Sequence, residues 1–415
     1  MNRTEWSLSG GRFLRLLAVA VAVASAASLP ATRMAAQESR PRLTLGGRGL
    51  VSVNLDRTRG LAPEGGTLTS ESSTVSDFSD TFVLLRLDQL LYGNDRVGMV
   101  VGFLFPDADT DLGQVFYDQI NVFYDARTYR VQLGRTRLGN FLVEFPTLRE
   151  EDVLEYGYVL NAFSDAENSE FSRYGNVIRG ELFRWNSRVI LRAQAANWAV
   201  TDRTGKLLDQ FDVNAAGASL TYRLPEALRY QGVVRDLSVG IQSQNLDEPG
   251  QAWIHSVMAA AAVNLSRHPL RSVTLTGQIV RNFGMDGVDA AELLTSPQGR
   301  ARASSTALLG SLRVLLRPYQ LDRLQAAVTA GYKAFDDIDA SRFTVLPNLF
   351  FRLGQGVDLG IQYQYERLGG MMAQALGNRD RHSLKLTLAL GFTSVFNDYF
   401  GERDDILNIE HGFIR

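Results

Sequence analysis

The residues that could do chemistry are concentrated in one stretch, residues 138–173. Its acids are Glu144, Glu150, Glu151, Asp152, Glu155, Asp165, Glu167 and Glu170. Only Arg149 and Arg173 oppose these eight carboxylates, so the local net charge is −6. Clustered carboxylates attract cations, and rings of Asp and Glu favour cations where they line a pore. The run Glu150–Asp152 lacks the spacing of an EF-hand loop, so we expect no metal site here.

Signs of catalysis are absent from the sequence. The histidines His255, His268, His382 and His411 are scattered, and none has the HExxH spacing of a zinc protease. His382 and Ser383 are adjacent, and adjacent residues on a strand point to opposite faces. There is no GxSxG, no phosphate-binding loop and no cysteine. We therefore expect neither an enzyme nor a cofactor, and the net charge of −2 gives no reason to expect nucleic-acid binding.

The acidic stretch must itself be positioned by folded elements. It spans 36 residues without a regular period, which is far longer than an ordinary connection. Disorder is not expected, because aromatic and aliphatic residues such as Phe145, Val153 and Tyr156 give the stretch much to bury. We interpret it as a folded acidic insertion that packs on whatever the flanking segments build.

The N-terminus has the features of an export signal. Arg3, Arg12 and Arg15 form a basic region, and the apolar run 14–27 has the length of a signal-peptide core. We place the signal peptide within residues 1–36, with cleavage after Ala26 or after Ala36. The run is too short for a transmembrane helix, and we expect an exported protein without a helical membrane span.

Strict alternation of apolar and polar residues dominates the rest of the chain. Val357–Glu366 and Ser383–Phe392 are the clearest cases, and alternation of this kind indicates strands with one apolar and one polar face. We therefore predict an all-β chain of about sixteen strands. They are expected near residues 42–55, 78–92, 96–105, 114–125, 129–137, 174–184, 187–200, 210–223, 234–246, 251–265, 270–282, 303–316, 321–334, 341–353, 356–369 and 381–396.

The connections alternate in length. Tight turns such as 93–95, 185–186 and 354–355 alternate with long segments at 56–77, 138–173, 283–302 and 369–380. Short turns at one end and long loops at the other are typical of an antiparallel outer-membrane β-barrel. Aromatic residues near the expected strand ends, among them Trp185 and Phe335, suit the aromatic girdles of such a barrel.

A signal, about sixteen alternating strands and a longest loop between strands five and six resemble a bacterial porin. The resemblance covers nearly the whole mature chain and is architectural, with GRTRLGNFLVEFPTLREED in the place of a constriction loop. It implies a barrel over residues 37–397 with short periplasmic turns, long extracellular loops and an inward-folded third loop. It also implies a homotrimer in contact with outer-membrane lipids and inserted by the barrel-assembly machinery. Residues 398–415 depart from the pattern, and they form either a tail or a closing strand.

Several arginines have the strand parity of the polar face. Arg86, Arg179, Arg313 and Arg352 alternate with apolar neighbours, so we expect them to face a lumen. Together with Glu144, Glu150, Glu151, Asp152 and Glu155 they are the predicted pore constriction. Charges paired off structurally are the other interpretation of the same row.

The expected function is a porin in the outer membrane that passes ions and small hydrophilic solutes. The alternatives are an uptake channel for hydrophobic or other specific small molecules, and a structural barrel without an open pore.

Overall fold

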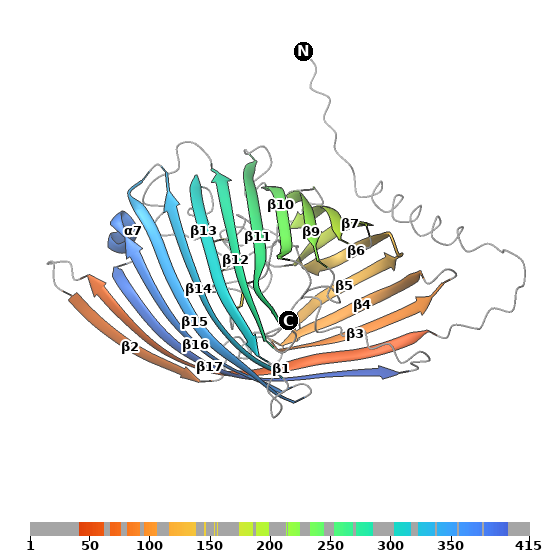
Figure 1. The fold of residues 1–415 in the computed structure, drawn as a ribbon, viewed down its shortest axis with the longest axis horizontal. Coiled ribbons are helices and arrows are strands. Elements are labelled where there is room, and N and C mark those ends of the chain that lie inside the picture. The colour runs from red at the N-terminus through yellow and green to blue at the C-terminus, as the bar shows by residue number, and fades with distance from the viewer. Residues whose placement is uncertain are drawn as a thin grey trace, which may run out of the picture.

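The structure is a computed structural model, and it describes the parts of the chain that form the sheet (Figure 1). The residues described are 41–61, 67–75, 81–91, 95–105, 116–137, 145–146, 153, 156, 174–185, 188–198, 213, 215–224, 233–244, 253–268, 271–284, 303–316, 323–336, 338–354, 357–375 and 377–396. The expected signal peptide, residues 1–36, and the expected tail or closing strand, residues 398–415, lie outside these ranges.

One antiparallel sheet contains all seventeen strands of the described residues. The strands are β1 (Arg42–Leu61), β2 (Thr67–Val75), β3 (Thr81–Leu90), β4 (Arg96–Phe105), β5 (Phe116–Asp125), β6 (Tyr129–Arg137), β7 (Tyr174–Arg184), β8 (Val189–Trp198), β9 (Ala215–Arg223), β10 (Val234–Gln244), β11 (Ile254–His268), β12 (Arg271–Phe283), β13 (Ser305–Leu316), β14 (Arg323–Phe335), β15 (Ala340–Gly354), β16 (Val357–Gly369) and β17 (Asn378–Phe396). A short helix, α7 (Gly370–Ala375), precedes the last strand. The prediction of an all-β antiparallel sheet is confirmed.

Strands that follow one another in the sequence lie side by side from β3 to β17 (Figure 1). The first strand joins the two ends of this series. Residues Leu43–Gly60 of β1 pair with β17, and on the other edge Arg42–Arg48 pair with β3 while Val53–Leu61 pair with β2. The start and the end of the described chain therefore meet at β1.

The two faces of the sheet differ in polarity, as the alternation predicts. On β12, the buried positions are Thr274, Thr276, Gln278, Val280 and Asn282, and the residues between them are more exposed. Large apolar residues occupy many of those exposed positions, for example Leu275 and Ile279, whose exposed fractions are 46% and 47%. We name the buried side the polar face and the exposed side the apolar face. A water-soluble sheet would show the reverse, with apolar residues buried and polar ones exposed.

Two expected long loops are partly regular structure. Residues 56–77 were predicted to be a loop, but they extend β1 to Leu61 and form β2, which makes a hairpin with β1. The prediction failed because Thr67–Val75 is almost entirely Thr, Ser and Glu, so it shows no apolar alternation, although Thr suits a strand. The strand count is consequently seventeen rather than sixteen.

The second of these loops, 369–380, contains α7 and the first residues of β17. Gly370 starts the helix with a φ of 58°, which favours glycine, and the Met371 N–H donates to the Asp339 carbonyl at 2.7 Å. Met372 and Ala373 pack with a group of buried apolar residues that consists of Ala303, Phe335, Ala340 and Leu368. Phe335 was expected in an aromatic girdle, and its burial in this cluster corrects that prediction. Within the described ranges, no helix has the length and apolar character needed to cross a membrane.

Candidate functional site

The polar face is lined mainly by amide and hydroxyl side chains. Across β9–β17 the buried polar residues include Ser219, Gln242, Gln244, Ser256, Thr276, Gln278, Asn282, Ser311, Gln325, Thr329, Thr344, Asn348, Gln362, Gln364, Ser383 and Thr387. Some of them bond one another across strands, as in the 2.6 Å hydrogen bond from Ser256 Oγ to Asn282 Oδ1. Such side chains suit a surface that meets water or polar solutes rather than an apolar core.

Charged side chains of the polar face occupy β1 and β3 near their pairing. Asp88 accepts from Arg42 Nε at 3.4 Å and lies 3.3 Å from Arg86 Nε. All three are at least largely buried, with exposed side-chain fractions of 11% or less. The Arg86 guanidinium also lies 4.8 Å from the centre of the Phe123 ring, a cation–π distance. A buried arginine is thus held by one carboxylate and one aromatic ring.

A second charged group spans β5 to β8. Glu181 accepts from Arg192 Nε at 2.6 Å and lies 3.7 Å from Arg130, which in turn donates to Asp125 at 2.7 Å. The registers Arg130↔Glu181 and Glu181↔Arg192 put these residues directly opposite each other on three strands. Opposite charges in facing positions stabilise the pairing of the strands.

The third charged group joins β15 and β16. Arg352 donates to both oxygens of Asp358, at 2.8 and 3.0 Å, and Arg342 donates to Glu366 at 2.7 Å. Two parallel hydrogen bonds between a guanidinium and a carboxylate fix their relative orientation. The arginines of the polar face described so far therefore each lie next to an acidic side chain.

The structure places the four predicted arginines on the polar face. Arg86 and Arg352 have the carboxylate partners given above, and Arg179 donates to Gln132 and Gln194, each at 3.4 Å. Arg313 lies opposite Thr274 on β12 and shares the parity of buried Ser311. The five predicted acids, Glu144, Glu150, Glu151, Asp152 and Glu155, lie outside the described residues.

Sequence reasoning missed several charged residues of this surface, namely Arg42, Asp125, Arg130, Arg192 and Asp358. Their parity could have revealed them, because each alternates with apolar neighbours in the way Arg86 does. The sequence does not reveal the register of the strands. The register places Glu181 between Arg130 and Arg192 on the neighbouring strands.

Four described residues of the acidic stretch lie against strands far away in the sequence. Tyr156 is 1% exposed, its hydroxyl donates to Thr344 Oγ1 on β15 at 2.6 Å, and its carbonyl accepts from Gln278 Nε2 on β12 at 3.0 Å. Burial raises the pKa of the Tyr156 phenol, so the group is protonated and able to donate at neutral pH. Two polar contacts and almost complete burial hold this residue on the polar face.

Pro146 is attached to the same wall. Its carbonyl accepts from Asn348 Nδ2 at 2.7 Å and from Thr329 Oγ1 at 3.4 Å. Gly331 leaves the space in which the Tyr156 ring sits, because a Cβ atom added there would lie 2.8 Å from two ring carbons. Residues of β12, β14 and β15 thus receive both ends of the described part of the stretch.

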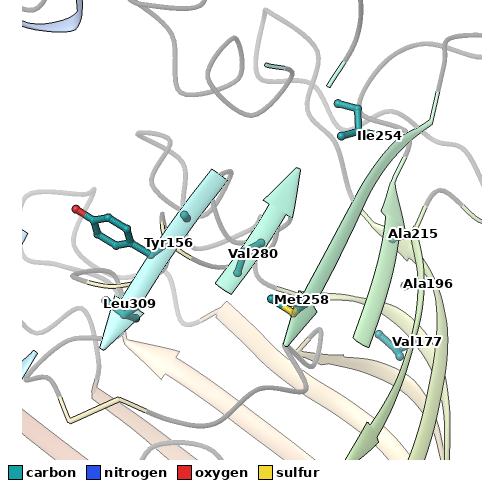
Figure 2. Packing of buried hydrophobic residues seen from close by; sticks show 9 residues of the cluster. Tyr156, Val177, Ala196, Ala215, Ile254, Met258, Val280 and Leu309 are labelled. Carbon is teal, nitrogen blue, oxygen red and sulfur yellow. The ribbon is translucent and has the colours of Figure 1, made fainter. Parts of the chain in front are cut away.

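Apolar contacts complete this attachment. Tyr156 belongs to a buried cluster with Val177, Ala196, Ala215, Ile254, Met258, Val280, Ala307 and Leu309, and Phe145 and Val153 pack against it (Figure 2). These wall residues come from β7 to β13, and most of them are small. Small apolar side chains on an otherwise polar face give the connection a surface on which it can bury its own apolar residues.

A metal site was not expected, and the described residues contain no group of three or more His, Asp or Glu side chains that could hold a metal ion.

Comparison with known proteins finds similar solved structures. No family model and no curated protein matches the chain. An anion-selective porin from Comamonas acidovorans superposes with a TM-score of 0.57 at 12% identity, covering 85% of this chain and 100% of that one. The outer-membrane channel DcaP of Acinetobacter baumannii gives 0.56 at 14% identity, with coverages of 88% and 100%. OmpT, an outer membrane protein of Vibrio cholerae seen in a trimer form, gives 0.56 at 8% identity, with coverages of 85% and 99%.

At sequence identities this low, the structural similarity establishes the fold alone. The sheet is of the kind found in bacterial outer-membrane porins and channels, and the similarity spans nearly the whole length of each of these proteins. The resemblance to a porin that the sequence suggests is confirmed at the level of architecture.

Proposed function

We propose that this protein is an outer-membrane channel of the porin type, which lets ions and small hydrophilic solutes diffuse through a β-barrel. The observation that carries the proposal is the inverted polarity of the sheet, with buried amides and charges on one face and exposed Leu, Ile and Val on the other. A lipid bilayer requires an apolar outer surface, and a large barrel encloses a polar interior. The apolar face is then the lipid contact, the polar face lines the lumen, and the cell location is the outer membrane.

The strand pairings support a closed barrel. β1 pairs with β17 on one edge and with β3 on the other, so the pairings return to their start. β2 follows β3 along the same edge of β1, and the two occupy one position in the wall. Counting β2 as an extension of the wall, we propose a barrel of sixteen wall strands, as the sequence suggests.

The acidic stretch is proposed to be the constriction. Its contacts from Tyr156 and Pro146 reach β12, β14 and β15, whereas its ends leave β6 and enter β7. A connection that starts on one side of a barrel and is bonded to the polar face of other strands crosses the lumen. The acids Glu144, Glu150, Glu151, Asp152 and Glu155 then share the lumen with Arg86, Arg179, Arg313 and Arg352.

One observation favours a second candidate, a barrel without an open pore. Several lumen-side residues in the middle of the wall are almost inaccessible, for example Gln362 and Thr329 at 0% and Gln325 at 1%. Burial of this degree is what a lumen filled throughout would produce.

Conductance in planar lipid bilayers separates the two candidates. The purified protein should insert in discrete steps of equal conductance, and groups of three steps would support the homotrimer that the porin resemblance implies. Correctly folded, heat-modifiable protein that inserts into the membrane without conducting would instead establish the closed barrel.

A further inference from the structure

The short-turn end of β5–β8 carries exposed arginines that no described acid neutralises. Arg127 lies in the turn between β5 and β6, and Arg184 and Arg188 flank the turn between β7 and β8. All three are exposed. Arg184 donates from Nη1 to the carbonyl of Phe183 at 3.4 Å, and none of the three forms an ion pair with an acid of the described ranges.

Backbone register brings these cations together. Tyr129 pairs with Leu182, and the Phe183 N–H donates to the Thr128 carbonyl at 2.8 Å, which carries the pairing one residue further. Arg127 precedes Thr128 and Arg184 follows Phe183, so the two arginines flank this bonded pair. Arg188 lies on the other side of the turn between β7 and β8, where its N–H donates to the Trp185 carbonyl at 3.3 Å. Like charges in facing positions destabilise strand pairing unless an anion lies between them.

The described acids of this end have other partners. Asp95 accepts from the Tyr124 hydroxyl at 2.5 Å, Asp125 accepts from Arg130 at 2.7 Å, and Asp236 accepts from Arg223 and Arg235 at 3.3 and 2.8 Å. The exposed arginines are therefore open to an anion that is not part of the described chain.

The surface next to these arginines is suited to acyl chains. Arg184 lies two residues beyond Leu182 on β7 and hence on the same apolar face, and Arg127 lies in the neighbouring turn, two residues before Tyr129. Tyr129 and Leu182 are 39% and 42% exposed, and Val131 continues the apolar surface at 43%. Trp185, held at a φ of 51°, is 78% exposed beside Arg184. Tryptophan and tyrosine beside cations at the edge of an apolar band are typical of the headgroup level of a membrane.

From this arrangement we infer a binding site for the phosphate headgroup of an anionic glycerophospholipid, made by Arg127 and Arg184 with Arg188 at its flank. The inference rests on the proposed membrane barrel. Charge complementarity selects an anion, and the continuous apolar surface selects one that carries acyl chains rather than a free ion. A phosphate between Arg127 and Arg184 relieves their repulsion, and the acyl chains lie along Tyr129, Leu182 and Val131.

Native mass spectrometry of the folded protein in mild detergent tests the site. Phosphatidylglycerol and phosphatidylcholine of the same acyl chains are titrated separately, so that only the headgroup charge differs. The parent protein should bind phosphatidylglycerol more tightly, and the pair Arg127→Gln and Arg184→Gln should weaken that binding about tenfold while leaving phosphatidylcholine unchanged. The matched control is Arg57→Gln with Arg59→Gln, two exposed arginines on β1 beyond its pairing with β3.

Each other outcome overturns part of the inference. Equal binding of the two lipids by the parent, or undiminished binding by the Arg127 and Arg184 variant, removes the site. Displacement of phosphatidylglycerol by millimolar inorganic phosphate would show a free-anion site rather than a lipid site. Heat-dependent gel mobility, measured on the same samples, reports separately whether the barrel itself is folded, so a failure of the proposed function is not mistaken for a failure of the site.

Discussion

Tyr156 connects the acidic stretch to the opposite part of the sheet through one ring. The ring fits only because residue 331 is glycine, and the hydroxyl finds Thr344 only because β14 and β15 pair in the register Gly331↔Thr344. The space left by Gly331 and the acceptor Thr344 therefore lie side by side on neighbouring strands. Together with Pro146, Tyr156 thereby fixes how far the connection stands from the wall, and in the proposed channel these contacts help to set the width of the pore.

Gly331→Ala is the first prediction at the residue scale. The new methyl group would lie 2.8 Å from the Tyr156 ring, and overpacking of this kind costs about 1–3 kcal/mol. We expect the ring to leave this space, so that single-channel conductance changes and current noise increases. Gly180→Ala is the matched control, because a Cβ atom there meets no atom within 4 Å. Identical traces for the two variants would contradict the role given to Tyr156.

Strand β10 shows the inverted polarity of the sheet most clearly. Val239, at the middle of Val234–Gln244, is 53% exposed, whereas its neighbour Ser238 is 3% exposed and shares a 2.9 Å hydrogen bond with Thr221. Val233, just before the strand, is also exposed, at 56%. The two valines thus have similar exposure but differ in their distance from the end of the strand.

Depth in the bilayer is the basis of the second prediction. Val239→Arg should destabilise the folded protein by about 2–4 kcal/mol, because an arginine at the midplane of the lipid face loses its water. Val233→Arg should cost about 0–1 kcal/mol, because this position lies at the membrane surface. Urea unfolding in lipid vesicles measures both. Equal losses at the two positions would mean that the apolar face is not a lipid contact.

Sequence reasoning recovered the strands because a half-buried strand imposes period two on its own residues. It located β4–β8 and β10–β16 nearly at their observed limits. It missed β2, since Ser and Thr on both faces leave no apolar period to detect. It also missed α7, where only Met372 and Ala373 are buried within a six-residue helix. A helix of that length has too few turns to show a period of 3.6 residues.

The candidate site was less predictable than the fold. Parity placed Arg86, Arg179, Arg313 and Arg352 on the polar face, since parity depends only on local alternation. The partners of Arg86 and Arg352 are also local, whereas the position of Glu181 between Arg130 and Arg192 depends on the register. Contacts of Tyr156 and Pro146 join residues 122 to 202 positions apart, and no local pattern specifies such distances in sequence.

Location follows from the apolar surface of the whole molecule. The mature protein should fractionate with outer membranes and migrate faster on a gel before boiling than after it. The reason is that a closed barrel has no unpaired edge at which unfolding can start, so detergent alone does not open it. Recovery from the soluble periplasm, or mobility that boiling does not change, would contradict the barrel.

Ion selectivity is the property that depends on the whole charge distribution. The acidic stretch carries a net −6, and inside a narrow lumen the effective dielectric constant is lower than in bulk water, so its field is stronger there. The opposing arginines contribute less than their number suggests, because Arg86 and Arg352 lie within 3.3 Å of Asp88 and Asp358. We therefore expect a mild preference for cations, which weakens as salt shortens the screening length below about 10 Å.

The combined replacement Glu150→Gln, Glu151→Gln, Asp152→Asn and Glu155→Gln tests this balance. The variant should shift the zero-current potential in a salt gradient toward that of an anion-preferring channel, because it removes four of the eight acids and leaves the arginines in place. Arg179→Gln should shift it in the opposite direction, because it removes a positive charge from the polar face, where Arg179 donates to Gln132 and Gln194. Glu71→Gln, on β2 and 70% exposed, is the control and should change nothing. If the four-acid variant keeps the parent's potential while Arg179→Gln moves it, the arginine row lines the constriction and the acidic stretch does not.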